Sequence, residues 1–264
     1  DELKGEALLS FCMAPHAPYT VSDRSFEQIV TLADQLQLPI HIHLHETNHE
    51  IEESLKQHGV RPIERMRRLG VLGPGLIAVH AVHLENNEIS MLASQGATVA
   101  HCPASNLKLA SGFAKVGKML AQGINVGIGT DGAASNNRLD LLSELRLAAL
   151  MAKAENADPE TLPAHAALRM ATLGGARALG LEREIGSIEA GKSADLVAVN
   201  LSAIELSPCY NPVSHLIYAA GREHVTDVWV RGRHIVNNGK LSFLDDSALK
   251  AKARTWRKKI ASEQ

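Results

Sequence analysis

Short apolar runs alternate with longer stretches of helical periodicity through the first two-thirds of the chain. Runs that suit β-strands occupy residues 8–13, 39–44, 76–79, 98–100 and 124–128. Apolar residues that recur every three or four positions, as on one face of a helix, occupy residues 22–36, 48–58, 86–94, 114–121, 139–154 and 164–179. Strands and helices that alternate in this way are typical of βα units around a parallel sheet.

Five such βα units can be counted, and two architectures can accommodate them. A closed (β/α)8 barrel needs eight units, over about 250 residues. An open, doubly wound sheet can be built from five. Periodicity alone leaves the two architectures in competition.

The pattern changes near residue 186. A turn-rich stretch at 186–199 leads into a strand, and residues 225–230 and 234–236 form a hairpin-like pair. These features predict a small β appendage over residues 186–243, after a main domain at 1–185. Residues 245–259 then predict a charged amphipathic helix within a C-terminal segment at 244–264.

Composition points to an ordinary globular protein whose partner is a small molecule. Hydrophobic residues make up 45% of the chain, charged residues 21%, and the formal net charge is −2. Nothing strongly basic indicates nucleic acid, and no apolar run reaches the roughly 18 residues of a membrane span. Three cysteines without a C-x-x-C pair and a charged stretch at 1–6 favour a reducing cytoplasm over secretion. A homo-oligomer is left open.

The second predicted strand carries three histidines, His41, His43 and His45. Because side chains alternate along a strand, all three are expected on one face. Three imidazoles on one face are costly in a plain core and suit a divalent metal, although one core histidine with two exposed ones is the simpler alternative. Glu46 follows at the strand end, where a partly desolvated carboxyl could hold or move a proton near neutral pH.

Two further strand ends carry candidate ligands. His80 ends the apolar run at 76–79, and His83 lies three residues further on, where a structural role is favoured. Asp131 follows the run at 124–128 and could bind metal, accept a proton from an activated water, or cap the following turn. Strand ends on one face of a barrel or sheet let such residues converge from distant parts of the chain.

His16 and His101 lie after the first and fourth predicted strands. Prolines on either side of His16 stiffen its backbone and present the imidazole in a fixed direction, which suits contact with a substrate. For His101 a role in organising its loop is equally consistent with the sequence.

Together these fragments resemble the amidohydrolase superfamily and, within its chlorohydrolase-like branch, the 5-methylthioadenosine/S-adenosylhomocysteine deaminases. The similar segments are Pro-His-Ala-Pro-Tyr at 15–19, His-Ile-His-Leu-His-Glu-Thr at 41–47, His-Ala-Val-His-Leu at 80–84, His-Cys-Pro-Ala-Ser-Asn at 101–106 and Gly-Thr-Asp-Gly-Ala-Ala-Ser-Asn-Asn at 129–137. The glycine-rich stretch at 186–197 and Val-Trp-Val-Arg-Gly-Arg at 228–233 resemble the family's β-sandwich.

The resemblance implies a (β/α)8 barrel of which this chain holds the last five units, strands four to eight, with part of a small β-sandwich. It implies zinc, or another divalent metal, bound by His43 and Asp131. His80 would polarise the water that the metal activates, Asp131 would take its proton, and Glu46 would pass a proton to the purine ring. His16, together with Glu46, would contact the substrate.

The resemblance also implies a ligand pair that these residues lack. Family members carry a His-x-His pair at the end of the first barrel strand, and no such pair precedes residue 41 here. We therefore expect an N-terminal segment outside this sequence to supply it. The expected reaction is hydrolytic deamination of an adenine nucleoside. The alternatives are deamination of guanine or cytosine, triazine dechlorination, and a non-catalytic barrel remnant that acts as a binding module.

Overall fold

A parallel four-stranded sheet forms the centre of the computed structural model, which describes residue 6 and residues 8–262. Its strands follow one another in the order of the sequence: β1 (Ile40–Leu44), β2 (Leu76–His80), β3 (Thr98–His101) and β4 (Asn125–Ile128). In register, Leu44 of β1 lies beside His80 of β2, so the carboxyl ends of neighbouring strands meet at one edge of the sheet. This edge is where the candidate side chains gather.

Burial explains why these short segments are strands. All five residues of β2 are buried, as expected for a strand of a parallel sheet covered on both faces. In β1 three buried residues alternate with two more accessible histidines, so one face is core and the other is open. The core continues into the helices, and full burial of a side chain such as Phe26 contributes roughly 2 kcal/mol.

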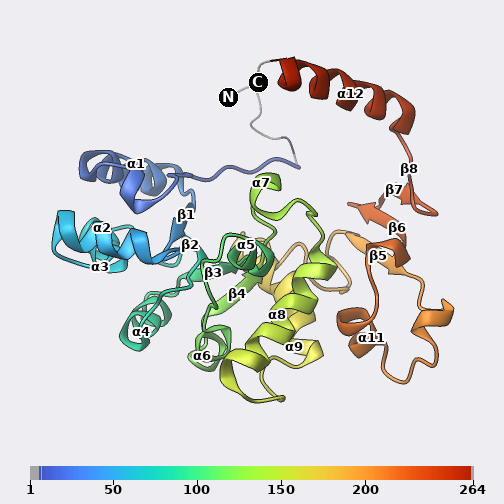
Figure 1. Ribbon diagram of the computed structural model, residues 1–264, viewed down its shortest axis with the longest axis horizontal. Coiled ribbons are helices and arrows are strands. Elements are labelled where there is room, and N and C mark those ends of the chain that lie inside the picture. The colour runs from blue at the N-terminus through green and yellow to red at the C-terminus, as the bar shows by residue number, and fades with distance from the viewer. Residues whose placement is uncertain (1–5, 7, 263–264) are drawn as a thin grey trace.

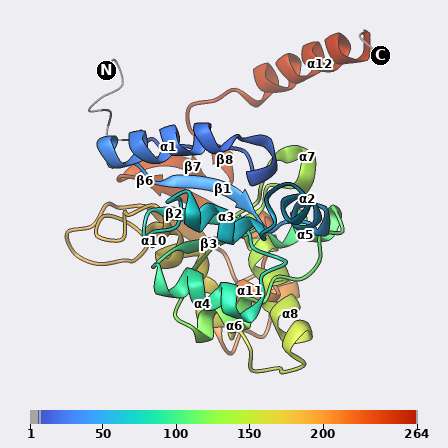
Figure 2. The ribbon, with the colours of Figure 1, turned by 90° about the vertical axis from the view of Figure 1, so that its left-hand side faces the viewer.

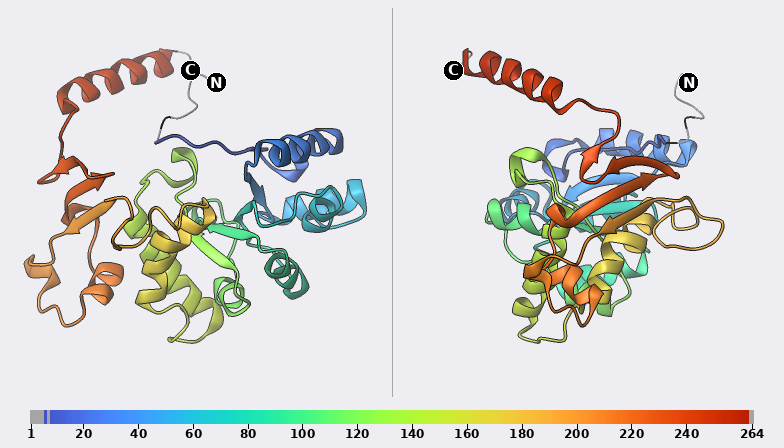
Figure 3. Two further views of the ribbon diagram at one scale, coloured as in Figure 1. Left: turned by 180° about the vertical axis from the view of Figure 1, so that it is seen from behind. Right: turned by 90° about the vertical axis from the view of Figure 1, so that its right-hand side faces the viewer.

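Helices cover the outer side of the sheet. Figure 1 shows α1, α4 and α6 following one another along it, and Figure 3 shows the same order from behind. The helices of this region are α1 (Asp23–Leu36), α2 (Asn48–His58), α3 (Pro62–Arg68), α4 (Asn86–Ser94), α5 (Pro103–Lys108), α6 (Val116–Ala121), α7 (Ala133–Asn136), α8 (Leu141–Asn156), α9 (Ala164–Arg169) and α10 (Gly175–Ala178).

Most of the predicted helices are confirmed, and their ends have visible causes. The prediction for α2 matches both bounds: Thr47 caps its first turn through a side-chain hydrogen bond, and Gly59 ends it in a left-handed conformation. The short helices α3, α5 and α7 were not predicted. Each has seven residues or fewer, too few for an apolar periodicity to be recognised.

The predicted helix at 164–179 is helical but not uniform. A π-helical turn, Met170–Gly174, separates α9 from α10. The segment approaches β4 very closely: a Cβ placed on Gly174 would lie 2.8 Å from the carbonyl oxygen of Val126. A residue with a side chain would clash with the backbone of β4, so only glycine fits here. The π-helical turn thus lies where the segment comes closest to the sheet.

The prediction of a strand at 8–13 was wrong. Only Met13 pairs with β1, through a single parallel bridge to Ile40, and Leu8, Leu9 and Phe11 are exposed. A run of β-forming residues needs a neighbouring strand for its hydrogen bonds, and among the described residues only β1 offers one. The structure thus has four parallel strands where five were expected, and within the described residues the sheet does not close.

A second sheet is antiparallel, with strand order β5-β6-β7-β8: β5 (Leu196–Val199), β6 (Val225–Val230), β7 (Arg233–Asn237) and β8 (Lys240–Leu241). It includes the strands predicted at 225–230 and 234–236 and appears orange to red in Figure 3. The helix α11 (Pro212–Tyr218), on the segment between β5 and β6, packs against α8 and α9 and so ties this part of the chain to the first.

The C-terminal helix α12 (Asp246–Ser262) confirms the helix predicted at 245–259. It extends away from the rest of the described chain in Figures 1 and 2. Its residues 246–261 are all exposed, including the large apolar residues Leu249, Trp256 and Ile260. No helix among the described residues is both long and apolar enough to cross a membrane.

Candidate metal centre

His43 lies on the accessible face of β1. It alternates with the buried residues Ile42 and Leu44, which anchor the strand in the core. Its Nδ1 lies 2.7 Å from the backbone oxygen of His16, which can only accept a hydrogen bond. The ring proton is therefore on Nδ1, and Nε2 keeps a free lone pair, as a metal-ligating histidine requires.

His80 ends β2 and is only 1% exposed. Its backbone has a φ of 71°, and Ala81 follows with a φ of 50°, so two non-glycine residues adopt the left-handed region where the strand turns into its loop. Such conformations are uncommon and concentrate at functional sites. The imidazole stacks on that of His43, with ring centroids 5.3 Å apart.

Asp131 follows β4 and also has a positive φ, of 59°. Its Oδ2 accepts hydrogen bonds from the hydroxyls of Ser105 at 2.7 Å and Ser135 at 2.6 Å. Burial by itself raises the pKa of this carboxyl, but the two hydroxyls and a backbone amide outweigh it and hold the pKa below its usual range. The group is thus an anion at neutral pH, with Oδ1 left for another partner.

These three residues converge. One potential ligand atom from each of His43, His80 and Asp131 lies within 4.8 Å of the others, and no other group of this kind occurs among the described residues. Nε2 of His43 is 4.0 Å from Oδ1 of Asp131. Two imidazole nitrogens and a carboxylate oxygen form a donor set that suits zinc and related transition metals better than magnesium or calcium.

Glu46 borders the cluster without belonging to it. Its Oε2 lies 3.7 Å from Nε2 of His80, and its side chain is 18% exposed. It follows β1 by two residues, so the turn of the chain there decides where its carboxyl points. The position allows proton exchange with a molecule bound beside Glu46 and His80.

The expectation that His41, His43 and His45 share one face was wrong for His45. Strand β1 ends at Leu44, and His45 adopts a φ of 55°, which takes it out of the alternation. Its ring is fully buried on the other side, where Nε2 accepts the amide hydrogen of Ile63 at 3.0 Å. Burial lowers the pKa of His45 to about 4, so the ring is neutral and structural. His41 is exposed.

The other three candidate histidines lie in different surroundings. His16 is exposed, and its ring centroid lies 5.1 Å from that of His43. His83 is half-buried: its backbone oxygen accepts from Arg61 at 2.6 Å, and its Nε2 lies 2.8 Å from the oxygen of Ser111. His101 is 1% exposed, with no partner for Nδ1 among the described residues, so it faces the interior.

Several residues around the cluster were missed by sequence reasoning. They are Glu50, Ser105, Asn106, Ser135 and Glu144, all of which hydrogen-bond to a cluster residue or to the loops that carry it. Glu50 could have been found, because Thr-x-x-Glu at 47–50 is the spacing of a capping box. Ser105 and Asn106 stood in the segment at 101–106, but nothing in the sequence indicated their partners.

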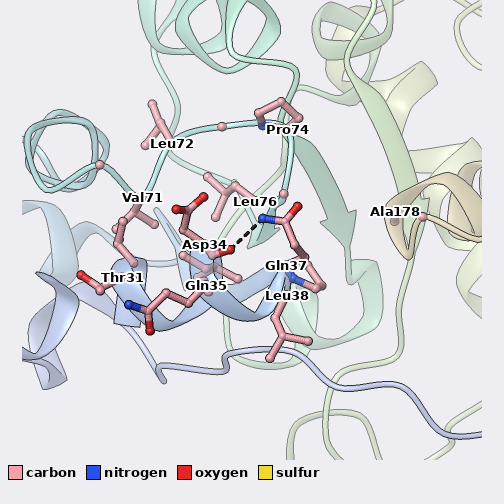
Figure 4. A pocket seen from close by; sticks show the side chains of 18 of the residues that line it. Thr31, Asp34, Gln35, Gln37, Leu38, Val71, Leu72, Pro74, Leu76 and Ala178 are labelled. Carbon is pink, nitrogen blue, oxygen red and sulfur yellow. Dashed lines mark hydrogen bonds between the residues drawn. The ribbon is translucent and has the colours of Figure 1, made fainter. Parts of the chain in front are cut away.

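A large cavity of about 970 Å³ lies elsewhere. It is lined by residues that precede β1 and β2, such as Gln37 and Pro74, and by the end of α10, including Ala178 (Figure 4). This is the amino end of the strands, opposite the edge that carries His43 and His80. Because barrel enzymes carry out their chemistry at the carboxyl ends of the strands, cavity size does not locate the candidate site here.

Comparison with known proteins gives a consistent picture. The model of the amidohydrolase family matches residues 2–235. A 5-methylthioadenosine/S-adenosylhomocysteine deaminase from Teredinibacter turnerae is 44% identical over 264 residues, which are all of this chain and 60% of the relative. A 5'-deoxyadenosine deaminase from Methanopyrus kandleri is 43% identical over 92% of this chain and 56% of its own length.

Solved structures similar to this chain include a deaminase and a chlorohydrolase. An adenosine deaminase from Xanthomonas campestris with bound zinc is 51% identical and superposes with a TM-score of 0.98, over 99% of this chain and 60% of that one. An atrazine chlorohydrolase variant from Arthrobacter aurescens with zinc and atraton is 29% identical, with a TM-score of 0.87 over 92% of this chain and 54% of that one. The chain thus spans about 60% of the length of the first of these relatives.

Proposed function

Because the chain belongs to the amidohydrolase family, we propose that His43, His80 and Asp131 are this chain's share of a zinc hydrolase site. The observation that carries the proposal is the convergence of their ligand atoms within 4.8 Å. Both imidazoles have Nδ1 held by an oxygen, so both Nε2 atoms are available. Other divalent transition metals suit the same donors, and the zinc in two solved relatives favours zinc.

We further propose that a segment outside this sequence completes the site with a His-x-His pair. His43 and Asp131 supply two donors, fewer than the four that zinc usually takes from protein and water together. Among the described residues, only Met13 pairs with the outer edge of β1, and the relatives are longer than this chain. The same segment would supply the strands that close a (β/α)8 barrel.

The reaction that fits these groups is hydrolytic deamination of an adenine nucleoside, such as 5-methylthioadenosine or S-adenosylhomocysteine. Bound zinc would lower the pKa of a water molecule toward about 7. Asp131 accepts the proton from the attacking water, and Nε2 of His80 orients it. Glu46 gives a proton to the ring nitrogen next to C6 as the oxygen bonds to C6. The proton held by Asp131 then passes to the amino nitrogen, and the hydroxyl on C6 gives its proton to Glu46. The bond from C6 to that nitrogen breaks, so ammonia and the inosine analogue leave and both carboxyl groups return to their starting states.

His16 would contact the substrate. Its ring is exposed and lies beside that of His43, while its backbone oxygen fixes the orientation of His43. The prolines at 15 and 18 hold this loop, so one residue both orients a ligand and borders the space that a nucleoside would enter.

Two alternatives use the same residues. Guanine, cytosine or triazine substrates need nearly the same chemistry, and a chlorohydrolase is among the structural relatives. The adenine nucleoside is favoured because the relatives named as nucleoside deaminases are 43–51% identical, against 29% for that chlorohydrolase. A non-catalytic remnant would have no chemical reason to keep the donors of His43, His80 and Asp131 converged.

The test uses the intact protein, purified without chelators. Its zinc content is measured by mass spectrometry, and ammonia release is followed with 5-methylthioadenosine, S-adenosylhomocysteine, adenosine, guanine and cytosine, with chloride release from a chlorotriazine. About one zinc per site and preference for an adenine nucleoside are expected. Preference for another heterocycle would overturn the substrate assignment, and a protein without metal or turnover would favour the binding module.

A further inference from the structure

Glu50 is a carboxylate with almost no access to solvent, being 2% exposed. It is the third residue of α2, whose N-terminal cap is Thr47. An acidic residue at this position usually returns to the amide of the cap itself. Here it reaches further back: Oε1 accepts the amide hydrogen of His45 at 3.0 Å, and Oε2 accepts that of Glu46 at 2.8 Å.

These two amides form an anion-binding nest. Two successive backbone N–H groups can point at one acceptor group when the first of the two residues is left-handed. His45 is the first residue here, and its φ is 55°. A histidine rarely adopts this conformation unless its surroundings hold it. The ring of His45 is held by the amide of Ile63, and the backbone on either side is held by Glu50. The turn out of β1 therefore depends on a buried carboxyl group.

This turn decides where the Glu46 side chain points. The Glu46 carboxylate has no hydrogen-bond partner among the described residues, and its Oε2 lies 3.7 Å from Nε2 of His80, too far for a hydrogen bond. No contact of its own thus fixes its direction. The direction is set by the backbone, whose amide is bound to Glu50.

We propose that Glu50 is a positioning residue, which acts through the backbone of Glu46 to aim the Glu46 carboxyl at the reacting ring. The inference rests on the proposed function, because it assumes that Glu46 moves a proton. A displacement of about 1 Å in a proton donor can cost as much as 10²-fold in rate. The hydrogen bonds of the Glu50 carboxyl go to the backbone amides of His45 and Glu46 and not to the ligand atoms of the cluster, so metal binding should not depend on it.

The first experiment replaces Glu50 in the intact, zinc-loaded protein. For Glu50→Gln we expect kcat on 5-methylthioadenosine to fall by at least about 10-fold. The KM should stay within about threefold, because a misaimed proton donor affects the transition state more than substrate binding. Zinc content should be unchanged. Glu52→Gln, an exposed residue of the same helix with the same change in charge, is the matched control and should leave all three values unaltered.

A double-mutant cycle separates positioning from a merely structural role. If Glu50 acts through Glu46, adding Glu50→Gln to Glu46→Gln should lower kcat by less than about twofold further. Losses that multiply would overturn the proposal. Hydrogen exchange gives a readout that needs no activity: the peptide that contains residues 45 and 46 should exchange faster in Glu50→Gln than in Glu52→Gln.

Two outcomes keep the failures distinct. If the wild-type protein deaminates nucleosides and Glu50→Gln has unchanged kcat, the inference is wrong and the proposed function stands. If the wild-type protein binds zinc but turns over no nucleoside, the proposed function is wrong and the inference falls with it.

Should Glu50→Gln not fold, Glu50→Asp keeps a carboxyl group on a side chain one methylene shorter, and its kcat should fall with zinc retained. Wild-type kcat in that variant would overturn the proposal.

Discussion

Asn106 and His80 form a buried pair in which Oδ1 of Asn106 lies 2.8 Å from Nδ1 of His80. An amide oxygen only accepts, so Nδ1 carries the ring proton and Nε2 presents its lone pair to the space shared with His43 and Asp131. Burial is the largest influence on the pKa of His80 and lowers it. Asn106 thus fixes the tautomer of His80.

The first prediction follows from this pair. In Asn106→Leu, Nδ1 of His80 loses its partner, and the ring can turn or change tautomer. The Nδ2 of Asn106 has no partner among the described residues, so the substitution removes one known hydrogen bond. We expect kcat on 5-methylthioadenosine to fall by about 10–100-fold, because His80 no longer orients the attacking water. Steady-state kinetics measure it, and Asn87→Leu, at an exposed position of α4, is the control. Equal kcat in both variants would contradict the assigned tautomer.

The second prediction concerns Glu46, which lies beside the cluster rather than in it. Glu46→Gln keeps the shape of the side chain but cannot deliver a proton in the same way. Zinc content should be retained, while kcat falls by at least about 10²-fold, the scale of general acid–base catalysis. Metal analysis and steady-state kinetics on 5-methylthioadenosine check both halves. Loss of the metal, or retained turnover, would remove Glu46 from the proton-transfer role.

The third prediction separates two roles for Asp131, metal ligand and turn cap. Asp131→Asn should lower both zinc occupancy and rate, because the anion is lost as a ligand and as a base. Asp158 is a suitable control, since it caps a turn by accepting from the amide of Glu160 and lies on the surface. If Asp131→Asn behaves like Asp158→Asn, with zinc and rate intact, the metal site lies elsewhere.

The fourth prediction uses the pH dependence of stability at Glu50. Burial raises the pKa of its carboxyl in the folded protein to about 7, from 4.5. Between these values the folded state holds a proton that the unfolded state has released, so this group's contribution to stability falls as the pH rises. Glu50→Gln does not titrate. Its stability deficit relative to wild type should therefore shrink from pH 4.5 to pH 7. Urea unfolding of both proteins across this range measures it, and a deficit that grows with pH would contradict the raised pKa.

The fifth prediction concerns a buried ion pair beneath the loops of the site. Nε of Arg61 donates to Oε1 of Glu88 at 2.7 Å, and the Glu88 side chain is 4% exposed. Arg61→Met leaves this carboxylate without its cation, which should cost about 3 kcal/mol of the free energy of unfolding. Denaturant titration measures the loss. Arg67→Met, which breaks an exposed pair with Glu64, should change little, and equal effects of the two would contradict the argument.

The sequence by itself determined where the candidate ligands lie. Apolar runs fix the ends of β1, β2 and β4, and His43, His80 and Asp131 stand at or just beyond those ends. Because parallel strands end at one edge of a sheet, local pattern was enough to predict that these residues would be near one another. The bounds of α2 could be predicted in the same way, because the residues that begin and end it, Thr47 and Gly59, are its immediate neighbours in the sequence.

Only the tertiary structure decided which groups face the cluster and what holds them. His45 continues the alternation in sequence, yet a left-handed turn buries its ring on the other side. Asn106 is 26 residues away from His80, and Ser105 is 26 away from Asp131. The periodicity of apolar residues depends only on residues close together in the sequence. The partners of His80 and Asp131 come close only when β1 to β4 and their loops assemble. The strand predicted at 8–13 failed for the same reason, since a strand exists only where another one pairs with it.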